Sequence, residues 1–567
     1  MIETLAHLDQ LAVCISLGLV LGFGLQTLKS LDLRSLGWCA VGLLLVALGV
    51  RLAFPPAFVH SNFHGTTLAE QIAGFPQPSV VRAYFGQASF VVLGIPARLA
   101  SDPWRAILVT NALCGTAALG LLALLAHRAG GRAAGLATLA LGALYPGLVR
   151  VAASEDAHNV GLMFGALSLV LCDSMRRQRR FDLTRLGLAA AATILAIYSR
   201  HTFHPWPALA LALLLPPGGA KSLLWSRRFL LVVGMSALLC LPRLAELFVH
   251  PNDAASYRTM IILGRLFGDP TFLLRHPLLR LDESVLVTPL LVMGIVHAWR
   301  QRSRVGLTVT VAVLFWVVLT LPFNVHPSYN EEYAFRLPLL GLAIVLAGIG
   351  AGAIWRAIDG RWRRNATAGV ALALLTAAPA TGLARLLDDP DPQHQELTLI
   401  LSAPRAPTDG TELVIPDADT PYLSPSYRPP RWGLTSQGWS WRVHRDQSRL
   451  PAGSRVYLGL GCYVFSPLEL ARITRVEDLI SSWDAMSPRE LSRLSAALWD
   501  APEKSIKLLG GALPTDELRP ECRRAARRGV SFEPWGTITI GRQQAPHAFF
   551  TRRRVPIGVW TLGETAP

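Results

Sequence analysis

The sequence predicts a polytopic α-helical membrane protein of about twelve spans, followed by a C-terminal soluble α/β domain outside the cytoplasm. Of its 567 residues 51% are hydrophobic and only 16% are charged, whereas soluble proteins carry about 25% charged residues. Many apolar runs approach the roughly 20 residues that cross a bilayer as a helix. Lys and Arg gather in every second connection between these runs, which is typical of a topology signal.

Twelve apolar segments are candidate spans, and those shorter than 20 residues would have to tilt or extend their polar ends toward water. The first is expected to be retained, because residues 1–10 carry Glu3 and Asp9 and no Lys or Arg, whereas a signal peptide would begin with basic residues. The segments are 8–28, 36–54, 104–127, 132–148, 157–174, 184–199, 203–217, 228–243, 285–299, 305–323, 335–353 and 366–384.

The arginine-rich connections fix the predicted orientation. Six of them alternate strictly with connections that carry few basic residues, and the most basic one lies at 176–185. Basic connections remain in the cytoplasm, so both termini are expected outside, in a bacterial-type plasma membrane. A further apolar run at 83–100 would invert this alternation if it crossed, and is therefore expected to lie at the interface. The transmembrane domain is then 1–384, with outer loops at 55–103 and 244–284.

The composition changes after the last predicted span. Residues 385–567 are polar and rich in Pro and Trp. They contain short β-like runs at 413–416, 455–459 and 537–540, and an amphipathic helical pattern at 477–499. The segment 385–567 is long enough to form one α/β domain.

Two cysteines, Cys462 and Cys522, are the only ones in the C-terminal part. We expect a disulfide between them, because oxidation is allowed outside the cytoplasm and neither has another partner in the domain. Two unpaired buried thiols are the alternative. The sequence contains no CxxC pattern, which is the spacing that would indicate a zinc site.

The formal net charge of +16 does not indicate a nucleic-acid partner. The arginines lie in short connections, and no basic segment is interleaved with aromatic residues. The membrane itself is the partner that this charge distribution predicts.

Three motifs carry a resemblance to a known family. A basic turn follows the third span at 126–132, with the sequence AHRAGGR. The next span ends at Pro146, and Glu155 and Asp156 head the helix after it. The eleventh span begins with YAFRLP around Arg336. Together these motifs resemble the GT-C superfamily of glycosyltransferases, which includes protein O-mannosyltransferases and the aminoarabinose transferases of lipid A.

The resemblance implies a membrane glycosyltransferase of the inverting, hexosyltransferase-like kind. It would move a sugar from a polyprenyl-phosphate donor to a lipid, glycan or protein acceptor on the outer face of the membrane. It implies no certain cofactor, although a divalent metal stays open. The alternatives are a non-catalytic GT-C relative and a transporter or flippase of lipid-linked glycans. Transporters often show internal repeats and polar sites at the midplane, and this sequence shows neither.

The first outer loop departs from the family pattern. The family usually has an aspartate early in this loop as the base toward the acceptor, but residues 55–82 contain none. They contain His60, His64 and Glu70 as candidate bases, and Asn62 as a candidate substrate contact. Imidazole can take a proton near neutral pH, while Glu70 also fits a helix-capping box. The missing aspartate is the feature that favours a non-catalytic relative.

Glu155 and Asp156 are candidate catalytic acids on the outer face, and His158 beside them is a candidate substrate contact. Charged groups at membrane depth are costly unless they are paired or functional. The alternative for the two acids is capping of the helix that they precede. His158 could equally be a polar residue at the membrane boundary.

Arg200 and Arg336 are candidate contacts to the donor phosphate, because guanidinium groups match phosphate oxygens. His201 beside Arg200 is a candidate substrate-binding residue. Arg200 could instead reach the interface with its charge. Glu332 lies one turn before Arg336 and is also a candidate substrate-binding residue, and the alternative is an ordinary helix salt bridge between the two.

Overall fold

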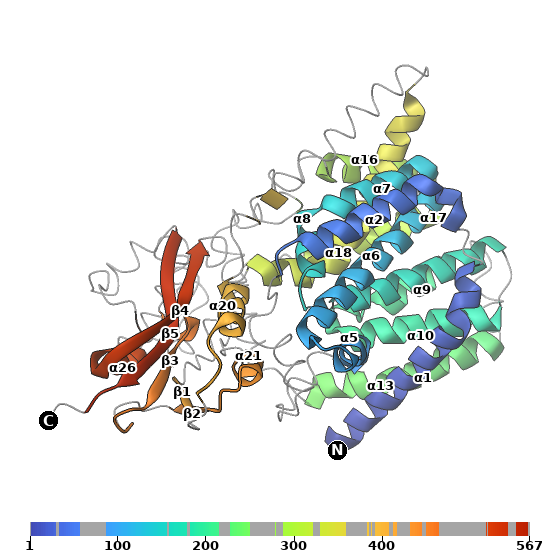
Figure 1. The fold of residues 1–567 in the computed structure, drawn as a ribbon. Helices are drawn as coiled ribbons and strands as arrows, with labels where there is room; N and C mark the ends of the chain where they lie inside the picture. The colour runs from blue at the N-terminus through green and yellow to red at the C-terminus, as the bar shows by residue number, and fades with distance from the viewer. Residues whose placement is uncertain are drawn as a thin grey trace, which may run out of the picture.

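The computed structural model contains a bundle of apolar helices and a C-terminal part built around a small sheet (Figure 1). The residues it describes are 2–29, 33–56, 87–155, 158–178, 182–214, 227–249, 278, 287–320, 329–358, 383–384, 387, 392–407, 412–416, 431–444, 450–463, 518, 520–541 and 552–564.

The bundle follows the apolar runs of the sequence. Every predicted span except the last contains a described helix, and 366–384 lies outside the described residues apart from its final two. The helices are α1 (Ile2–Lys29), α2 (Trp38–Ala53), α5 (Gln87–Leu99), α6 (Pro103–Gly130), α7 (Arg132–Leu144), α8 (Pro146–Ala152), α9 (His158–Gln178), α10 (Leu183–Ser199), α11 (Trp206–Leu214), α13 (Arg227–Val249), α16 (Val287–Arg300), α17 (Arg304–Thr320) and α18 (Tyr329–Ala357), with 3₁₀ turns η1 (Leu33–Leu36) and η2 (His201–Phe203).

Within the described residues, three helical stretches are long and apolar enough to cross a membrane. They are Pro103–Gly130, His158–Gln178 and Arg336–Ala357, and the bent pair α7 and α8 would make a fourth. The other apolar helices are shorter, such as Trp38–Ala53 and Arg304–Val318. The chain is therefore mostly helical with membrane-crossing segments, and a count of twelve spans remains a prediction.

The predicted span 132–148 is not one continuous helix. α7 ends at Leu144, Tyr145 has an extended conformation, and Pro146 is the first residue of α8. Proline has no amide proton and its ring disfavours a helical conformation for the preceding residue, and the axis bends by 63° between α7 and α8. The bend turns α8 across the end of the bundle instead of along it.

α18 lies at the centre of the bundle and packs against α6, α7, α8, α9, α16 and α17. Its crossing with α16 depends on two glycines. A methyl group on Gly294 would lie 1.9 Å from the carbonyl oxygen of Leu346, and one on Gly350 would lie 2.0 Å from that of Leu290. Only glycine allows two helix backbones to approach this closely.

One end of the bundle is held by a buried carboxylate. Asp173 near the end of α9 is fully buried and accepts hydrogen bonds from Arg176 at 2.6 Å and Arg177 at 2.8 Å. Arg128 of α6 contacts it at 3.4 Å. Opposite charges offset the cost of burying this carboxylate, so the cluster joins the ends of α6 and α9. This is the end that carries the most basic connection of the sequence.

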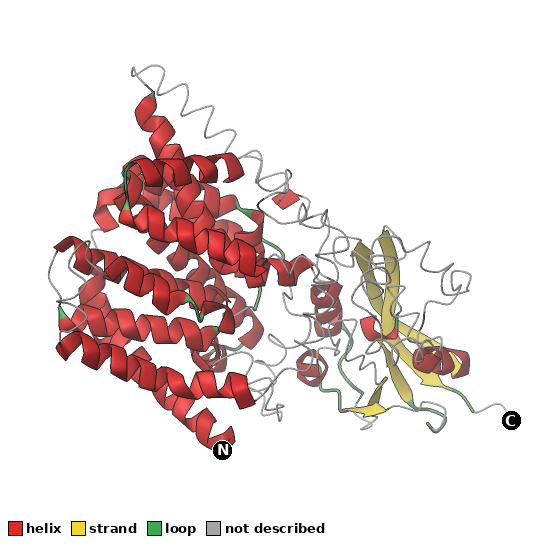
Figure 2. Ribbon diagram, turned by 180° about the vertical axis from the view of Figure 1, so that it is seen from behind, coloured by secondary structure: helices red, strands yellow, loops and turns green. Residues whose placement is uncertain are grey.

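The C-terminal part contains a five-stranded mixed sheet in the order β2-β1-β3-β5-β4. β1 pairs in parallel with β2 and β3, whereas β5 pairs antiparallel with β3 and β4. Two predicted strands recur as β1 and β3, the third lies inside the longer β4, and the helical pattern at 477–499 lies outside the described residues. The elements are α20 (Pro392–Ser402), β1 (Leu413–Pro416), α21 (Arg431–Ser436), β2 (Trp441–His444), β3 (Arg455–Leu458), η6 (Leu460–Cys462), α26 (Pro520–Arg528), β4 (Gly529–Gly541) and β5 (Arg552–Leu562) (Figure 2).

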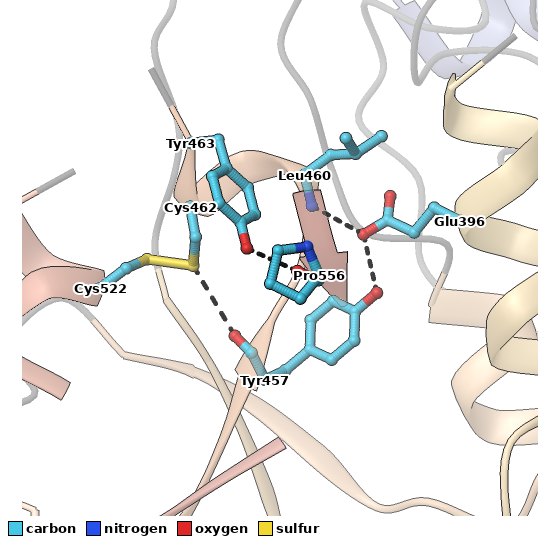
Figure 3. Close-up of a disulfide and its surroundings, with 7 residues drawn as sticks. All are labelled: Glu396, Tyr457, Leu460, Cys462, Tyr463, Cys522 and Pro556. Atoms are coloured by element: carbon cyan, nitrogen blue, oxygen red, sulfur yellow. Dashed lines mark hydrogen bonds between the residues drawn. A yellow bond between two sulfur atoms is a disulfide. The ribbon is translucent and has the colours of Figure 1, made fainter. Parts of the chain in front are cut away.

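A disulfide joins Cys462 to Cys522, the pair expected from the sequence (Figure 3). Their Cα atoms are 5.5 Å apart, within the range that a disulfide spans. Cys462 follows β3 and Cys522 lies in the helix before β4, so the bond connects two elements 60 residues apart in sequence. Beside it, the Tyr463 hydroxyl donates to the carbonyl of Pro556 at 2.5 Å.

Candidate active site

The turn between α8 and α9 carries Glu155 into the interior of the protein. All seven residues of α8 are buried, and Glu155, three residues after that helix, is only 2% exposed. The Ser154 hydroxyl donates to the carbonyl of Val151 at 2.6 Å, which satisfies an acceptor that the end of α8 leaves open. The carboxylate therefore sits at a fixed and buried position.

Asn111 of α6 holds this turn in place. Its side-chain amide donates to the carbonyls of Val151 at 3.1 Å and Ser154 at 2.6 Å. One helical turn along α6, a methyl group on Gly115 would lie 3.0 Å from Cβ of Ala152. The close approach of α6 and the amide bridge together fix the backbone that presents Glu155.

Arg150 in the middle of α8 is fully buried. Its guanidinium carbon lies 5.8 Å from the centre of the Phe54 ring, just after α2, a distance at which cation and ring attract. The bend between α7 and α8 is what brings this charged side chain into the end of the bundle.

Arg200 is also fully buried, at the C-terminal cap of α10. Its amide donates to Ala196 at 3.3 Å, and its carbonyl accepts from the amide of Phe203 at 3.1 Å. The Ser89 hydroxyl of α5 donates to the carbonyl of Ser199 at 3.0 Å. The helix formed by the 83–100 run thus contacts the residue next to Arg200.

Close packing of α9 brings His158 next to η2. His158 is fully buried, and its ring centre lies 6.4 Å from that of Phe203. A methyl group on Gly161 would lie 2.4 Å from the Phe203 ring, and one on Gly165 would lie 2.6 Å from the Trp206 ring. The glycines on α9 leave room for these aromatic rings. The turn η2, which directly follows Arg200, therefore packs against the first half of α9.

Arg336 lies level with the start of α9. It is fully buried on α18, and a methyl group on Gly341, five residues later, would lie 3.1 Å from Leu162 of α9. Further along, Ile349 of α18 lies against Gly130 of α6, and Asp173 of α9 contacts Arg128 of α6. The two helices therefore run in the same direction. Five residues back from the contact at Gly341, about 7.5 Å along the axis, Arg336 is next to the level of His158.

Five of the described buried side chains therefore belong to elements that meet at one end of the bundle, opposite Asp173. α18 packs against α8, α9 and η2, and α6 packs against α8 and α9. Burial of ionised groups is costly without partners or a role, and the elements that meet at this end bury three guanidinium groups and one carboxylate. The five are Arg150, Glu155, His158, Arg200 and Arg336.

The remaining candidates from the sequence lie outside what the structure describes. His60, Asn62, His64 and Glu70 fall in 57–86, and Asp156 falls in 156–157. For His201 and Glu332 the structure describes the backbone, in η2 and α18, and not the side chain. Their roles and their separation from Glu155 remain predictions.

Within the described residues, no group of three His, Cys, Asp or Glu side chains is arranged to hold a metal ion. In the buried cluster the residues of these types are Glu155 and His158. A divalent metal remains a hypothesis from the sequence.

Two site residues were missed by reading the sequence. Asn111 lies in an uncharged apolar run, and only the fold shows that its amide reaches α8. Arg150 stood out only as a basic residue in a short outer connection. Pro146 was the sequence signal that could have indicated a helix break here, and with it the burial of Arg150 within the bundle.

Comparison with known proteins finds similarity in structure alone, since no family model and no curated protein matches the sequence. ArnT from Cupriavidus metallidurans bound to undecaprenyl phosphate is 13% identical, with a TM-score of 0.46 over 71% of this chain and 85% of that one. The apo form of that protein is 14% identical, with a TM-score of 0.44 over 71% of this chain and 84% of that one.

The oligosaccharyltransferase of Archaeoglobus fulgidus, solved with Zn and sulfate, is 12% identical with a TM-score of 0.44. The match covers 66% of this chain and 60% of that one, so this chain spans less than two thirds of its length. Both neighbours are GT-C glycosyltransferases, the superfamily that the sequence motifs resemble. At these scores and identities the likeness concerns the path of the chain and says nothing about substrate.

Proposed function

We propose that this protein is a membrane glycosyltransferase. It moves a sugar from a polyprenyl-phosphate donor to an acceptor hydroxyl on the outer face of the membrane. The observation that carries the proposal is that Arg150, Arg200 and Arg336 are fully buried, as Glu155 is nearly so, on elements that pack together at one end of the bundle. Guanidinium groups bind phosphate through paired hydrogen bonds. The phosphate of a lipid-linked donor is an anion that can enter a buried site of a membrane protein laterally, from the bilayer.

The arginines serve the leaving group in this proposal. The acceptor oxygen forms a bond to the anomeric carbon while the bond from that carbon to the phosphate oxygen breaks. The electron pair leaves with the phosphate, and the configuration at carbon inverts. Arg200 and Arg336, with Arg150 beside them, stabilise the negative charge as it develops in a site with little water.

A proton acceptor for the acceptor hydroxyl completes the reaction. The candidates from the sequence are His60, His64 and Glu70 of the first outer loop, and Glu155 and Asp156 before α9. Substrate contacts are proposed for Asn62, His158, His201 and Glu332. The variants Asp156→Asn and His64→Ala test two of these roles directly, and full transfer by both would remove these residues from the mechanism.

The orientation proposed here has both termini outside the plasma membrane. Residues 1–384 form the membrane domain, and residues 385–567 form the outer domain. Two observations support this orientation. Basic connections alternate strictly with the others, and the C-terminal part lies at the end of the bundle opposite Asp173 and the most basic connection.

Labelling with a membrane-impermeant thiol reagent checks this orientation. In a background without the five unpaired cysteines, we expect Gln178→Cys at the end of α9 to stay unlabelled in intact cells and to react after lysis. Ser101→Cys, an exposed position before α6, is the matched outer control and should react in intact cells. Labelling of Gln178→Cys from outside would reverse the proposed orientation.

Sugar transfer in reconstituted vesicles tests the function itself. Purified protein should move radiolabelled sugar from a polyprenyl-phosphate donor into an acceptor fraction, and boiled protein should not. A flippase would instead change the leaflet of the intact labelled donor without breaking its glycosidic bond. A non-catalytic relative would bind the donor and do neither, and either of these results would refute the proposal.

A further inference from the structure

Arg51 in the last turn of α2 is a cation buried inside the helical bundle. It is only 2% exposed, although a charge at membrane depth is costly unless it is paired or functional. Its guanidinium donates from Nη1 to the carbonyl of Ala47 on its own helix and from Nη2 to the carbonyl of Gly142 on α7, both at 2.9 Å. Within the part of the chain that the structure describes, its partners are these two carbonyls and no carboxylate. An ion pair is therefore not what keeps this charge in the bundle.

The carbonyl of Gly142 is one that α7 cannot satisfy by itself. In an α-helix it would accept the amide proton of the residue four positions on, and that residue is Pro146, which has no amide proton. The regular ladder stops one residue earlier, where the amide of Tyr145 donates to Leu141 at 2.9 Å. Gly142 and both its neighbours in sequence are buried, so this carbonyl lies away from bulk water. Arg51 supplies the donor that the proline lacks.

This hydrogen bond stabilises the break between α7 and α8. Backbone groups that a proline frees in a membrane helix have to be satisfied by neighbouring side chains. The planar fork of a guanidinium can serve two carbonyls at once, so one side chain joins the end of α2 to the end of α7. The 63° bend at Pro146 thus depends on a residue that lies 91 positions before Gly142 in the sequence.

The same end of α2 also contacts the helix beyond the break. α2 packs along α7, and α8 lies at their common end (Figure 1). Phe54, three residues after Arg51, forms a buried cluster with Val149 of α8. The Phe54 ring also lies 5.8 Å from the guanidinium carbon of Arg150. Arg51 therefore holds α7 on one side of the break, and Phe54 holds α8 on the other.

We propose that Arg51 is a positioning residue of the active site. By capping the broken end of α7, it sets the angle at which α8 carries Arg150 and the turn with Glu155. This inference rests on the proposed function and adds a residue that itself touches no substrate. Without Arg51 the Gly142 carbonyl has to find another donor, and the backbone at Pro146 shifts to provide one. A misplacement of about 1 Å in a site of this kind can cost about 100-fold in rate.

The experiment compares Arg51→Met and Arg51→Lys with Arg98→Met in the transfer assay. Arg98 is exposed in the last turn of α5, so its variant is the matched control for the loss of a charge. We expect Arg51→Met to lower kcat by about 10- to 100-fold, because Arg150 is displaced from the leaving phosphate. The KM for the donor should change by less than about threefold, because Arg200 and Arg336 lie on other helices and still bind the phosphate. Arg51→Lys keeps the charge and one donor and should recover part of the rate.

A second substitution separates positioning from folding. Pro146→Ala in the Arg51→Met background restores an amide at position 146, which can donate to the Gly142 carbonyl as in an ordinary helix. The melting temperature of this double variant in detergent should return toward that of wild type. Its kcat should stay low, because a continuous helix no longer turns α8 across the end of the bundle. Recovery of both would mean that Arg51 serves folding alone, and the inference would be wrong.

A cysteine pair follows the position of α8 without any substrate. In a background without the five unpaired cysteines, Val50→Cys and Val149→Cys lie in one packed cluster and should form a disulfide with a membrane-permeable oxidant. The bond should also form with Arg51→Lys and be lost in the double variant. An unchanged yield in the double variant overturns the inference.

The rates decide the remaining outcomes. A kcat for Arg51→Met within about threefold of that for Arg98→Met overturns the inference, because a misplaced site would lose more than this. Absence of transfer by wild type and Arg98→Met alike, with the expected disulfide yields, would instead refute the proposed function and leave the capping of α7 by Arg51 in place.

Discussion

Arg336→Ala is expected to lower sugar transfer by about 100-fold or more, since removal of a single preorganised charge from a developing anion costs roughly this much. The effect should appear in kcat, because the phosphate carries more negative charge as it leaves than it does in the bound donor. Arg200→Ala should behave in the same way. The measurement is the initial rate of label transfer at saturating donor, with purified protein in vesicles of constant composition.

A matched control separates this effect from a general loss of positive charge. Arg105 lies at the same end of the bundle on α6 but is exposed, so Arg105→Ala should keep near wild-type activity. Arg336→Lys should recover only part of the rate, because an ammonium group keeps the charge and lacks the planar fork. Arg336→Ala and Arg200→Ala with rates within threefold of Arg105→Ala would show that the buried arginines have no part in the reaction.

Replacing Cys462 and Cys522 by serine is expected to destabilise the C-terminal domain by about 4 kcal/mol, from the entropy of a loop of this length in the unfolded chain. The two residues are 60 positions apart, and the bond connects the end of β3 to the helix before β4. Because Tyr457 and Leu460 next to it hold Glu396, unfolding here should also release α20 from the sheet. Full-length protein, unfolded in denaturant and followed by tryptophan fluorescence, gives the measurement.

Reduction of wild-type protein should reproduce the effect, whereas Cys39→Ser, at an exposed unpaired cysteine of the bundle, should not. The same denaturation midpoint for the double serine variant and wild type would mean that the bond contributes nothing to stability.

Much of the fold follows from the order of apolar and basic residues. A helix in a membrane must satisfy its own backbone, so a run of about 20 apolar residues has one dominant solution, and α6, α9 and α18 appear where the sequence predicts them. Short strands such as 413–416 were also visible from their β-branched residues. β2 and β5 were not predicted, because their sequences are mixed and become strands only beside β1, β3 and β4.

The candidate site was predicted only in part. Arg200 and Arg336 could be named from the sequence because charge at the end of an apolar run is costly and so draws attention. Asn111 gives no such signal, because a single amide in a long helix is ordinary until α8 lies against it.

The sequence by itself determined the membrane class, most helix positions, the orientation signal and the cysteine pair, because these depend on local composition and on the side of the membrane. Only the tertiary structure decided which polar side chains meet. The 63° bend at Pro146 and the close packing at Gly161 and Gly341 place Arg150, Glu155 and Arg336 in elements that meet at one end, and α20 packs on α6 through Leu397 and Trp104. Such contacts arise between residues far apart in the chain, and their energy depends on shape and burial that no short stretch of sequence contains.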